Sequence, residues 1–341
     1  MNPMLFMRHL PTYLRINLSP PSCVVDMRDA YVDMTRFIGI LLMVIGHSYF
    51  IYWFGGWWPG RIIWSFHMPL FFITSGYMHK QRELSDVFYH GIRTLVYPYF
   101  IFGTVALFIS ILKYGECLSD ALYLFTTANS SPAYNNGRTI GPIWFLLALF
   151  WGRLYFTCVL KYFRHFHILV SLIVTCLAFS IHETINPPLG LLNGANALIF
   201  ISIGYYIREH GLNIVIIIAT LILYPFALLY SGLDMAHIAY NNVPLAITGA
   251  LGGTMIAFFV AILLTNCPLT RWLSTYGKYS IQVLCWHYLI RLYLRDHFEM
   301  TTWQLVLFVA APFAITYITS KSERFNILFK YPSNPSTINT K

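Results

Sequence analysis

Long apolar runs dominate this chain and favour a helical membrane protein over any other fold. Stretches of about 20 mainly apolar residues, enough to cross a bilayer as a helix, recur between residues 34 and 320. Their apolar residues are continuous and do not alternate with polar ones, which argues against a membrane β-barrel. Charged residues make up only 10% of the chain, against roughly 25% in a soluble protein. The sequence therefore predicts an all-α, polytopic transmembrane helix bundle.

The apolar runs divide the chain into about ten predicted spans, with boundaries good to a few residues. These are 34–54, 62–79, 92–113, 141–160, 166–183, 189–207, 212–232, 244–266, 278–296 and 303–320. We expect a cytoplasmic leader over 1–30, a membrane domain over 31–320 and a cytoplasmic tail over 321–341. The leader has no apolar core ahead of a cleavage site, unlike a signal peptide.

The positions of Lys and Arg predict the orientation of these spans. With the N-terminus inside and the spans alternating, most basic residues between spans lie on the cytoplasmic side. Only Arg61, Lys113, Arg138, Arg291 and Arg295 lie outside. This bias follows the positive-inside rule, and it favours an even number of spans with both termini cytoplasmic.

Composition excludes several classes of function. The net charge is +9, but the basic residues are scattered singly between apolar runs, so topology explains them better than nucleic-acid binding does. The cysteines have no CxxC or other metal-ligand spacing, so we expect no metal site. There is no Walker loop and no GxGxxG motif, so nothing indicates ATP hydrolysis or a dinucleotide fold.

The first predicted span carries a stripe of ionisable residues. Arg36 and His47 are eleven residues apart, which on a helix is three turns plus about 20°, or about 16 Å along the axis. Asp33 lies one turn before Arg36 and near the same face. Ionisable groups inside a membrane are costly, so they indicate a function by default. The alternative is that His47 only forms a hydrogen bond to a neighbouring helix.

Other polar residues lie within later spans. His67 and Ser75 share one face of the second span, and His287 lies in the ninth. Trp144 belongs to the motif Gly-Pro-Ile-Trp-Phe that opens the fourth span. We take these four residues as candidates for contacts with substrate. For Ser75 the simpler interpretation is a hydrogen bond to its own helix. Arg153 also falls inside a span, and the sequence does not identify its partner.

A basic segment follows the second span on the predicted cytoplasmic side. It contains Lys80, Arg82 and Arg93. Such residues pair well with phosphate and would suit a donor molecule that carries phosphate groups. The simpler alternative is that they are ordinary positive-inside residues.

Taken together, these segments resemble the integral membrane acyltransferase family often called acyltransferase 3, including its fucose 4-O-acetylase-like branch. The resemblance covers about residues 28–320. It rests on Arg28-Asp-Ala-Tyr-Val-Asp-Met-Thr-Arg-Phe-Ile-Gly-Ile, Gly46-His-Ser, Phe66-His-Met-Pro-Leu-Phe-Phe, Ser75-Gly-Tyr, Arg93 before Pro98-Tyr99, Pro142-Ile-Trp-Phe-Leu, and Ser280 through His287. The most specific element is an arginine and a histidine separated by ten residues in the first span.

The resemblance implies an enzyme of about ten spans. It would move an acyl group, usually acetyl, from cytoplasmic acyl-CoA to a hydroxyl of a cell-surface glycan or of its lipid-linked oligosaccharide precursor. His47 would be the catalytic histidine, Arg36 would hold the donor or stabilise charge, and Asp33 would orient Arg36. Arg93, with Lys80 and Arg82, would contact the CoA phosphates. Arg93 is followed by Thr94, where many relatives have a second basic residue.

On this basis we expect a bacterial inner-membrane O-acetyltransferase that uses acetyl-CoA as donor and meets membrane lipid, but needs neither metal nor nucleic acid. A polysaccharide exporter or proton-coupled transporter is the main alternative, because buried histidines and arginines also occur in carriers. A carrier often has paired halves with interrupted helices, and the sequence has no such symmetry. A noncatalytic scaffold would leave the stripe from Arg36 to His47 unexplained.

Overall fold

The computed structural model describes residues 15–16, 25–48, 57–128, 141–185, 187–294, 302–322, 325 and 329. Most of the predicted leader and tail therefore lies outside the described residues. The elements are β1 (Arg15–Ile16), α1 (Val25–Gly46), α3 (Trp57–Tyr77), α4 (Leu84–Gly91), the π-helix η3 (Ile92–Val96), α5 (Tyr97–Tyr114), α6 (Leu118–Thr127), η4 (Gly141–Ile143), α8 (Trp144–Phe163), η5 (Arg164–Phe166), α9 (His167–Ile181), η6 (Pro188–Gly190), α10 (Leu191–Asn196), α11 (Leu198–His210), β2 (Leu212–Asn213), α12 (Ile214–Tyr230), β3 (Leu233–Asp234), β4 (Ala239–Tyr240), α13 (Val243–Asn266), η7 (Arg271–Leu273), α14 (Ser274–Lys278), α15 (Ser280–Tyr293) and α16 (Thr302–Ser320).

The all-α prediction is confirmed, and every predicted span overlaps a helix. The boundaries differ most at α1, which begins at Val25, ahead of both the predicted span and the predicted domain boundary at residue 31. Its first turns carry aspartates and an arginine, so a search for apolar residues misses them. The end of the predicted span, from residue 49 onward, lies outside the described residues.

Two helices occupy segments for which no helix was predicted. Helix α4 covers Leu84–Gly91, in the basic segment after the second span. Helix α6 covers Leu118–Thr127, in the connection after α5. Both are shorter than a membrane span, which needs about 20 residues. They are therefore invisible to an analysis based on long apolar runs.

Length and hydropathy alone identify fewer spans than the sequence analysis predicts. Among the described residues, four helical segments are long and apolar enough to cross a membrane, or five if the bent pair Pro188–Asn196 and Leu198–His210 is one span. The two parts of that pair meet at 47°. One of the four segments, Gly141–Ile181, runs through two predicted spans. The chain is thus a multi-pass membrane protein, and the number of ten spans stays a prediction.

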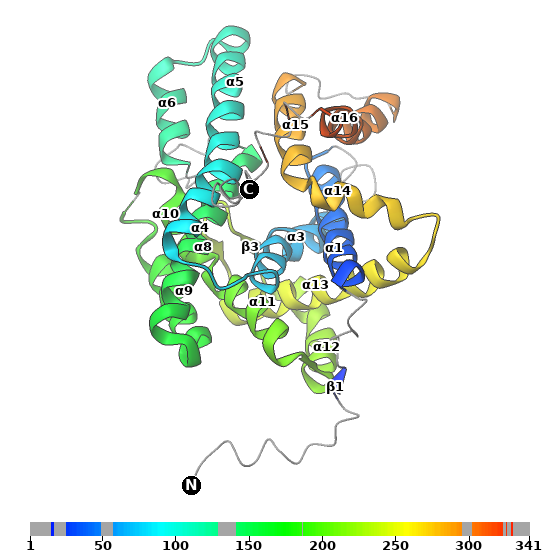
Figure 1. Cartoon of the computed structure of the whole chain (residues 1–341). Coiled ribbons are helices and arrows are strands. Elements are labelled where there is room, and N and C mark those ends of the chain that lie inside the picture. Colours follow the sequence, from blue (N-terminus) through cyan, green and yellow to red (C-terminus); the bar gives the residue numbers. More distant parts are fainter. Residues whose placement is uncertain are drawn as a thin grey trace, which may run out of the picture.

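The helices α1, α3, α11 and α13 pack together in the bundle, with α14 across the start of α1 (Figure 1). The approach of α3 to α11 is set by glycine. A Cβ atom on Gly76 would lie 1.9 Å from the carbonyl oxygen of Ile201, and one on Gly204 would lie 1.9 Å from that of Ile73. Small residues at membrane helix contacts allow such close backbone packing. This contact holds α3, which carries His67 and Ser75, against α11.

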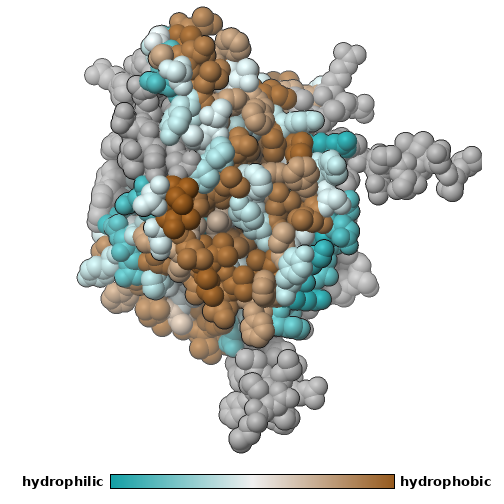
Figure 2. All heavy atoms as spheres, turned by 90° about the vertical axis from the view of Figure 1, so that its left-hand side faces the viewer, coloured by the Kyte–Doolittle hydropathy of each residue, from teal (hydrophilic) through white to brown (hydrophobic). Residues whose placement is uncertain are grey.

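Exposed apolar side chains cover the outside of the bundle. Leu112 on α5, Leu177 on α9, Ile222 on α12 and Leu263 on α13 are each more than half exposed. Figure 2 shows a broad hydrophobic surface on one face of the molecule. An apolar surface of this extent marks contact with membrane or with another protein. In a multi-pass membrane protein, lipid hydrocarbon accounts for it.

Candidate functional site

Three imidazole rings from three separate helices meet inside the bundle. His47 follows the end of α1, His67 lies midway along α3, and His287 lies midway along α15. The ring centroids of His47 and His287 are 5.7 Å apart, and those of His47 and His67 are 6.4 Å apart. His67 is 5% exposed and His287 is 0% exposed. The structure therefore places His47 between two of the residues that the sequence suggested for substrate contacts.

Backbone hydrogen bonds orient two of the three rings. Nδ1 of His47 lies 2.8 Å from the carbonyl oxygen of Met43, and Nδ1 of His67 lies 2.9 Å from that of Ile63. A carbonyl oxygen only accepts, so Nδ1 carries the hydrogen in both rings. In each neutral ring, Nε2 then keeps a lone pair. His47 can therefore take up a proton or act as a nucleophile through Nε2.

A second polar cluster lies towards the Tyr77 end of α3. Nε of Arg36 donates to Oγ1 of Thr74 at 3.5 Å, and Nη1 of Arg36 lies 3.5 Å from Oδ1 of Asp33. The predicted pairing of Asp33 with Arg36 is present. Nε of Arg153 donates to Oγ of the next residue on α3, Ser75, at 2.9 Å. Two neighbouring hydroxyls of α3 thus hold one guanidinium each.

More positive charge surrounds this end of α3. Arg153 lies within electrostatic reach of Arg36 and Arg82. Arg208, at the end of α11, donates to the carbonyl oxygen of His79 just beyond α3. His79 itself lies within electrostatic reach of Arg153, Arg208 and Arg82. Four arginines, Arg36, Arg82, Arg153 and Arg208, therefore supply the positive charge of this cluster.

Three of the predicted site residues do not lie at the centre of either cluster. Lys80 is exposed in the segment after α3, and Arg93 is exposed on the π-helix η3. Single π-helical turns are frequent at functional sites, but they have no sequence signature. Trp144 is 5% exposed and belongs to the hydrophobic core, where its ring contacts that of Phe145. Its predicted contact with substrate stays a prediction.

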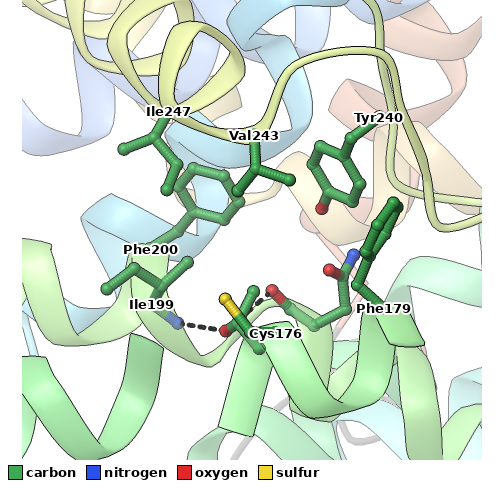
Figure 3. A pocket seen from close by; sticks show the side chains of 9 residues that line it. Cys176, Phe179, Ile199, Phe200, Tyr240, Val243 and Ile247 are labelled. Atoms are coloured by element: carbon green, nitrogen blue, oxygen red, sulfur yellow. Dashed lines mark hydrogen bonds between the residues drawn. The ribbon is translucent and has the colours of Figure 1, made fainter. Parts of the chain in front are cut away.

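Two cavities lie outside the histidine cluster. The larger borders the arginine cluster, since Thr74 lines it together with apolar residues of α1, α11, α12 and α13. The smaller lies between α9, α11, β4 and α13 (Figure 3). Tyr240, Phe200 and Cys176 line it, and it has room for little more than one water molecule. This cavity is therefore too small to hold an organic substrate.

A short hairpin formed by β3 and β4 lies near the histidine cluster. Nδ1 of His237 donates to Oδ2 of Asp234 at 2.5 Å, and this hydrogen bond raises the pKa of His237. Asp234 also lies within electrostatic reach of His67. The hairpin is anchored by the side-chain amide of Asn193, which donates to two of its carbonyls. It brings a negative charge to the end of α3 opposite the arginines.

The family comparison gives this arrangement a chemical context. A family model described as an acyltransferase domain, acyltransferase 3, matches residues 29–321. The chain belongs to the acyltransferase 3 family. No curated protein and no solved structure matched it significantly. Membership confirms the resemblance drawn from the sequence at the level of the family, and it assigns a membrane acyltransferase activity in general terms.

All of the polar elements described above lie within the acyltransferase 3 domain. They form a site with two poles: histidines around the middle of α3, and arginines that contact α3 about two turns further along. Histidines can move protons, and arginines can hold anionic groups. Among the described residues, no group of His, Cys, Asp and Glu is arranged to hold a metal ion.

The hydrogen bond between Arg153 and Ser75 gives a direct test of the arginine cluster. We expect Ser75→Ala to lower the stability of this acyltransferase 3 domain by about 1–3 kcal/mol, because a charged, partly buried donor loses its partner. Thermal unfolding in detergent measures this. Ser231→Ala is the matched control, since Ser231 is also buried but its hydroxyl bonds its own helix. Equal unfolding temperatures for both variants would show that the Arg153 contact contributes nothing.

Sequence reasoning missed the roles of several residues here. Arg153 was recognised inside a span but without a partner, and Arg208 was counted only as one of many cytoplasmic charges. Thr74 gave no signal apart from its place beside Ser75. The helical period relates residues on one helix, whereas these contacts join α3 to α1, α8 and α11.

Proposed function

We propose that this protein is a membrane O-acyltransferase. It moves an acetyl or other short acyl group from cytoplasmic acyl-CoA to a hydroxyl of a cell-surface glycan or its lipid-linked precursor. The observation that carries the proposal is that the ring of His47 meets the rings of His67 and His287 inside the bundle. His47 lies on the same helix stripe as Arg36. The family supports acyl transfer, and this geometry supplies a base and a cationic donor site.

Contacts between helix ends support the predicted alternation of spans. Four hydrogen bonds each join helix ends that the alternation puts on the same side of the membrane. They connect Tyr31 with Asn266 and His79 with Arg208 on the predicted inner side, and Arg61 with Ser231 and Lys113 with Tyr293 on the predicted outer side. The pairing of β1 with β2 also joins two segments predicted to be inside. The Tyr77 end of α3 is then the cytoplasmic end.

This orientation puts the arginine cluster where an acyl-CoA donor would arrive. Coenzyme A carries several phosphate charges, so it stays on the cytoplasmic side. Arg36, Arg82, Arg153 and Arg208 would pair with these phosphates or stabilise charge near the thioester. Lys80 and Arg93 are exposed on the same predicted side and would extend this positive surface. Asp33 would orient Arg36.

The histidine cluster would perform the transfer about 16 Å from Arg36 along the axis of α1. Nε2 of His47 would take the proton from the acceptor hydroxyl, whose oxygen then attacks the acyl carbonyl carbon. His67 would contact the acceptor or the acyl group. The acyl group must thus reach mid-membrane depth, while the CoA nucleotide remains at the inner rim.

The remaining features of the proposal concern the setting of the enzyme. We place it in the bacterial inner membrane, with a glycan or lipid-linked oligosaccharide as acceptor. Ser75 would act through Arg153 on the donor side. Trp144 would line the path of the substrate.

Transfer of radiolabelled acetyl from acetyl-CoA into glycan, in inverted membrane vesicles, tests this function. We expect label in the glycan of vesicles that contain the protein and none in vesicles without it. Transfer should continue after the proton gradient is collapsed, because an acyltransferase needs no gradient. A signal that disappears with the gradient would favour the transporter, whose buried histidines would then carry protons. Absence of label with a good supply of glycan and several short acyl-CoA donors would reject the acyltransferase.

A further inference from the structure

The ring of His287 differs from the other two imidazoles of the site in its hydrogen bonding. His287 is 0% exposed, and neither of its ring nitrogens has a hydrogen-bond partner in the part of the chain that the structure describes. The rings of His47 and His67 each donate to a backbone carbonyl one turn earlier. A buried polar group without a partner is unfavourable compared with an apolar side chain of similar shape. Packing alone therefore does not explain a histidine at this position.

Two rings, one apolar and one polar, contact His287 in the described part of the chain. The ring of Phe308 on α16 lies 5.1 Å from it, centroid to centroid, and is apolar. The ring of His47 lies 5.7 Å away at an angle of 65°. Arg291, one turn further along α15, lies within electrostatic reach of both histidines. His287 is thus next to the residue whose protonation would change during transfer.

We propose that His287 is a positioning residue that accepts a hydrogen bond from His47 when His47 takes up the proton of the acceptor hydroxyl. This inference rests on the function proposed above, with His47 as the base. The neutral ring of His287 has one nitrogen with a lone pair. Because Nδ1–H of His47 is engaged with Met43, this lone pair can accept the new Nε2–H of the imidazolium until that proton passes to the thiolate. A hydrogen bond to a charged group is stronger than one between neutral groups.

Every bond that breaks during the proposed transfer is matched by one that forms. The O–H bond of the acceptor breaks as Nε2 of His47 takes the proton. The bond from this oxygen to the acyl carbon forms, and the C–S bond of the thioester breaks. His47 then gives the proton to the thiolate, so that coenzyme A leaves as a thiol. His287 neither gains nor loses a proton, since it only stabilises the short-lived imidazolium.

His67 does not fill this role as well. Its centroid is 6.4 Å from that of His47, against 5.7 Å for His287, and its ring is already oriented by a hydrogen bond to Ile63. The role therefore falls to His287, whose ring is nearer and has no other hydrogen-bond partner among the described residues.

Two substitutions separate this role from packing. His287→Phe fills the same space without polar atoms, whereas His287→Gln keeps an acceptor oxygen but cannot act as a base. We expect His287→Phe to lower kcat by about 10–100-fold, and His287→Gln to recover most of this loss. The KM for acyl-CoA should stay within about twofold in both, because the donor binds at the arginine cluster. His287→Leu serves as a second apolar variant if His287→Phe fails to fold.

His167 supplies a matched control. It is also a buried histidine, at 6% exposure, but its Nδ1 lies 2.6 Å from Oγ of Ser202. His167→Gln and His167→Phe should change the unfolding temperature and leave kcat of the folded enzyme unchanged. If His287→Phe or His287→Leu transfers as fast as His287→Gln or faster, His287 is a packing residue and the inference is wrong. If the wild type transfers no acyl group at all, the proposed function fails, and this inference fails with it.

Discussion

Replacement of His47 by alanine is expected to lower the rate of acyl transfer by about 10²–10⁴-fold, the usual contribution of a general base. Nδ1 of this ring is engaged with the carbonyl of Met43, so Nε2 is the free basic nitrogen of the residue. Asp33 and Arg36 on the same stripe of α1 cannot replace it, because both lie about 16 Å or more away along the helix axis. The vesicle assay with radiolabelled acetyl-CoA measures the loss.

The control for His47→Ala must separate chemistry from folding. His210→Ala removes an exposed imidazole at the end of α11 and should leave transfer unchanged. The membrane abundance of His47→Ala should match that of the wild type. Its unfolding temperature should fall by no more than the loss of one hydrogen bond, the one to the carbonyl of Met43, explains. Transfer at the wild-type rate by folded His47→Ala would show that the reaction does not depend on this histidine.

Gly76→Ala is expected to destabilise the helix bundle strongly. The added Cβ would lie 1.9 Å from the carbonyl oxygen of Ile201, a backbone atom that cannot move aside as a side chain can. Helices α3 and α11 must then separate, and we expect a loss of about 3 kcal/mol or more, at the upper end for overpacked sites. Unfolding in detergent, followed by the near-ultraviolet signal of the tryptophans, measures it.

Gly249→Ala is the matched control for this prediction. Gly249 also lies within a helix, α13, but the nearest atom to its added Cβ would be the Cβ of Ala227 at 3.2 Å, so a small shift relieves the contact. We expect Gly249→Ala to lower the free energy of unfolding by less than about 1 kcal/mol. If Gly76→Ala unfolded at the same temperature as Gly249→Ala, the close contact between α3 and α11 would be wrong.

The sequence predicted what depends on one helix at a time. Apolar runs identified the helices, and the helical period put Asp33, Arg36 and His47 on one stripe. The convergence of His47 with His287 could not be predicted, because it depends on how α1 and α15 cross, and no local pattern encodes that. Ser75 illustrates the same limit. A bond to its own helix was the simpler expectation, yet its hydroxyl accepts from Arg153 on α8.

Short or polar helices also escaped the sequence analysis. The first turns of α1 contain too many polar residues to be predicted as part of a span, and α6 contains too few residues. The bend of 47° before α11 falls within the predicted span 189–207, which is rich in Gly and Asn. Glycine permits such irregular backbone, but its position alone does not fix an angle.

The glycine contacts of α3 and α1 have a consequence for how the protein works. Gly76 and Gly204 allow α3 and α11 to pack backbone to backbone. Gly277 does the same for α14 and α1, since a Cβ on it would lie 1.6 Å from the carbonyl oxygen of Asp33. Neither α3 nor α1 can slide or rotate against its neighbour without breaking these close contacts. Each of the two helices is therefore fixed to its neighbour, and the distances between spectroscopic labels on α3 and α11, and on α1 and α14, should not change during turnover. In the proposed reaction, the pantetheine arm of the donor would then be the part that moves.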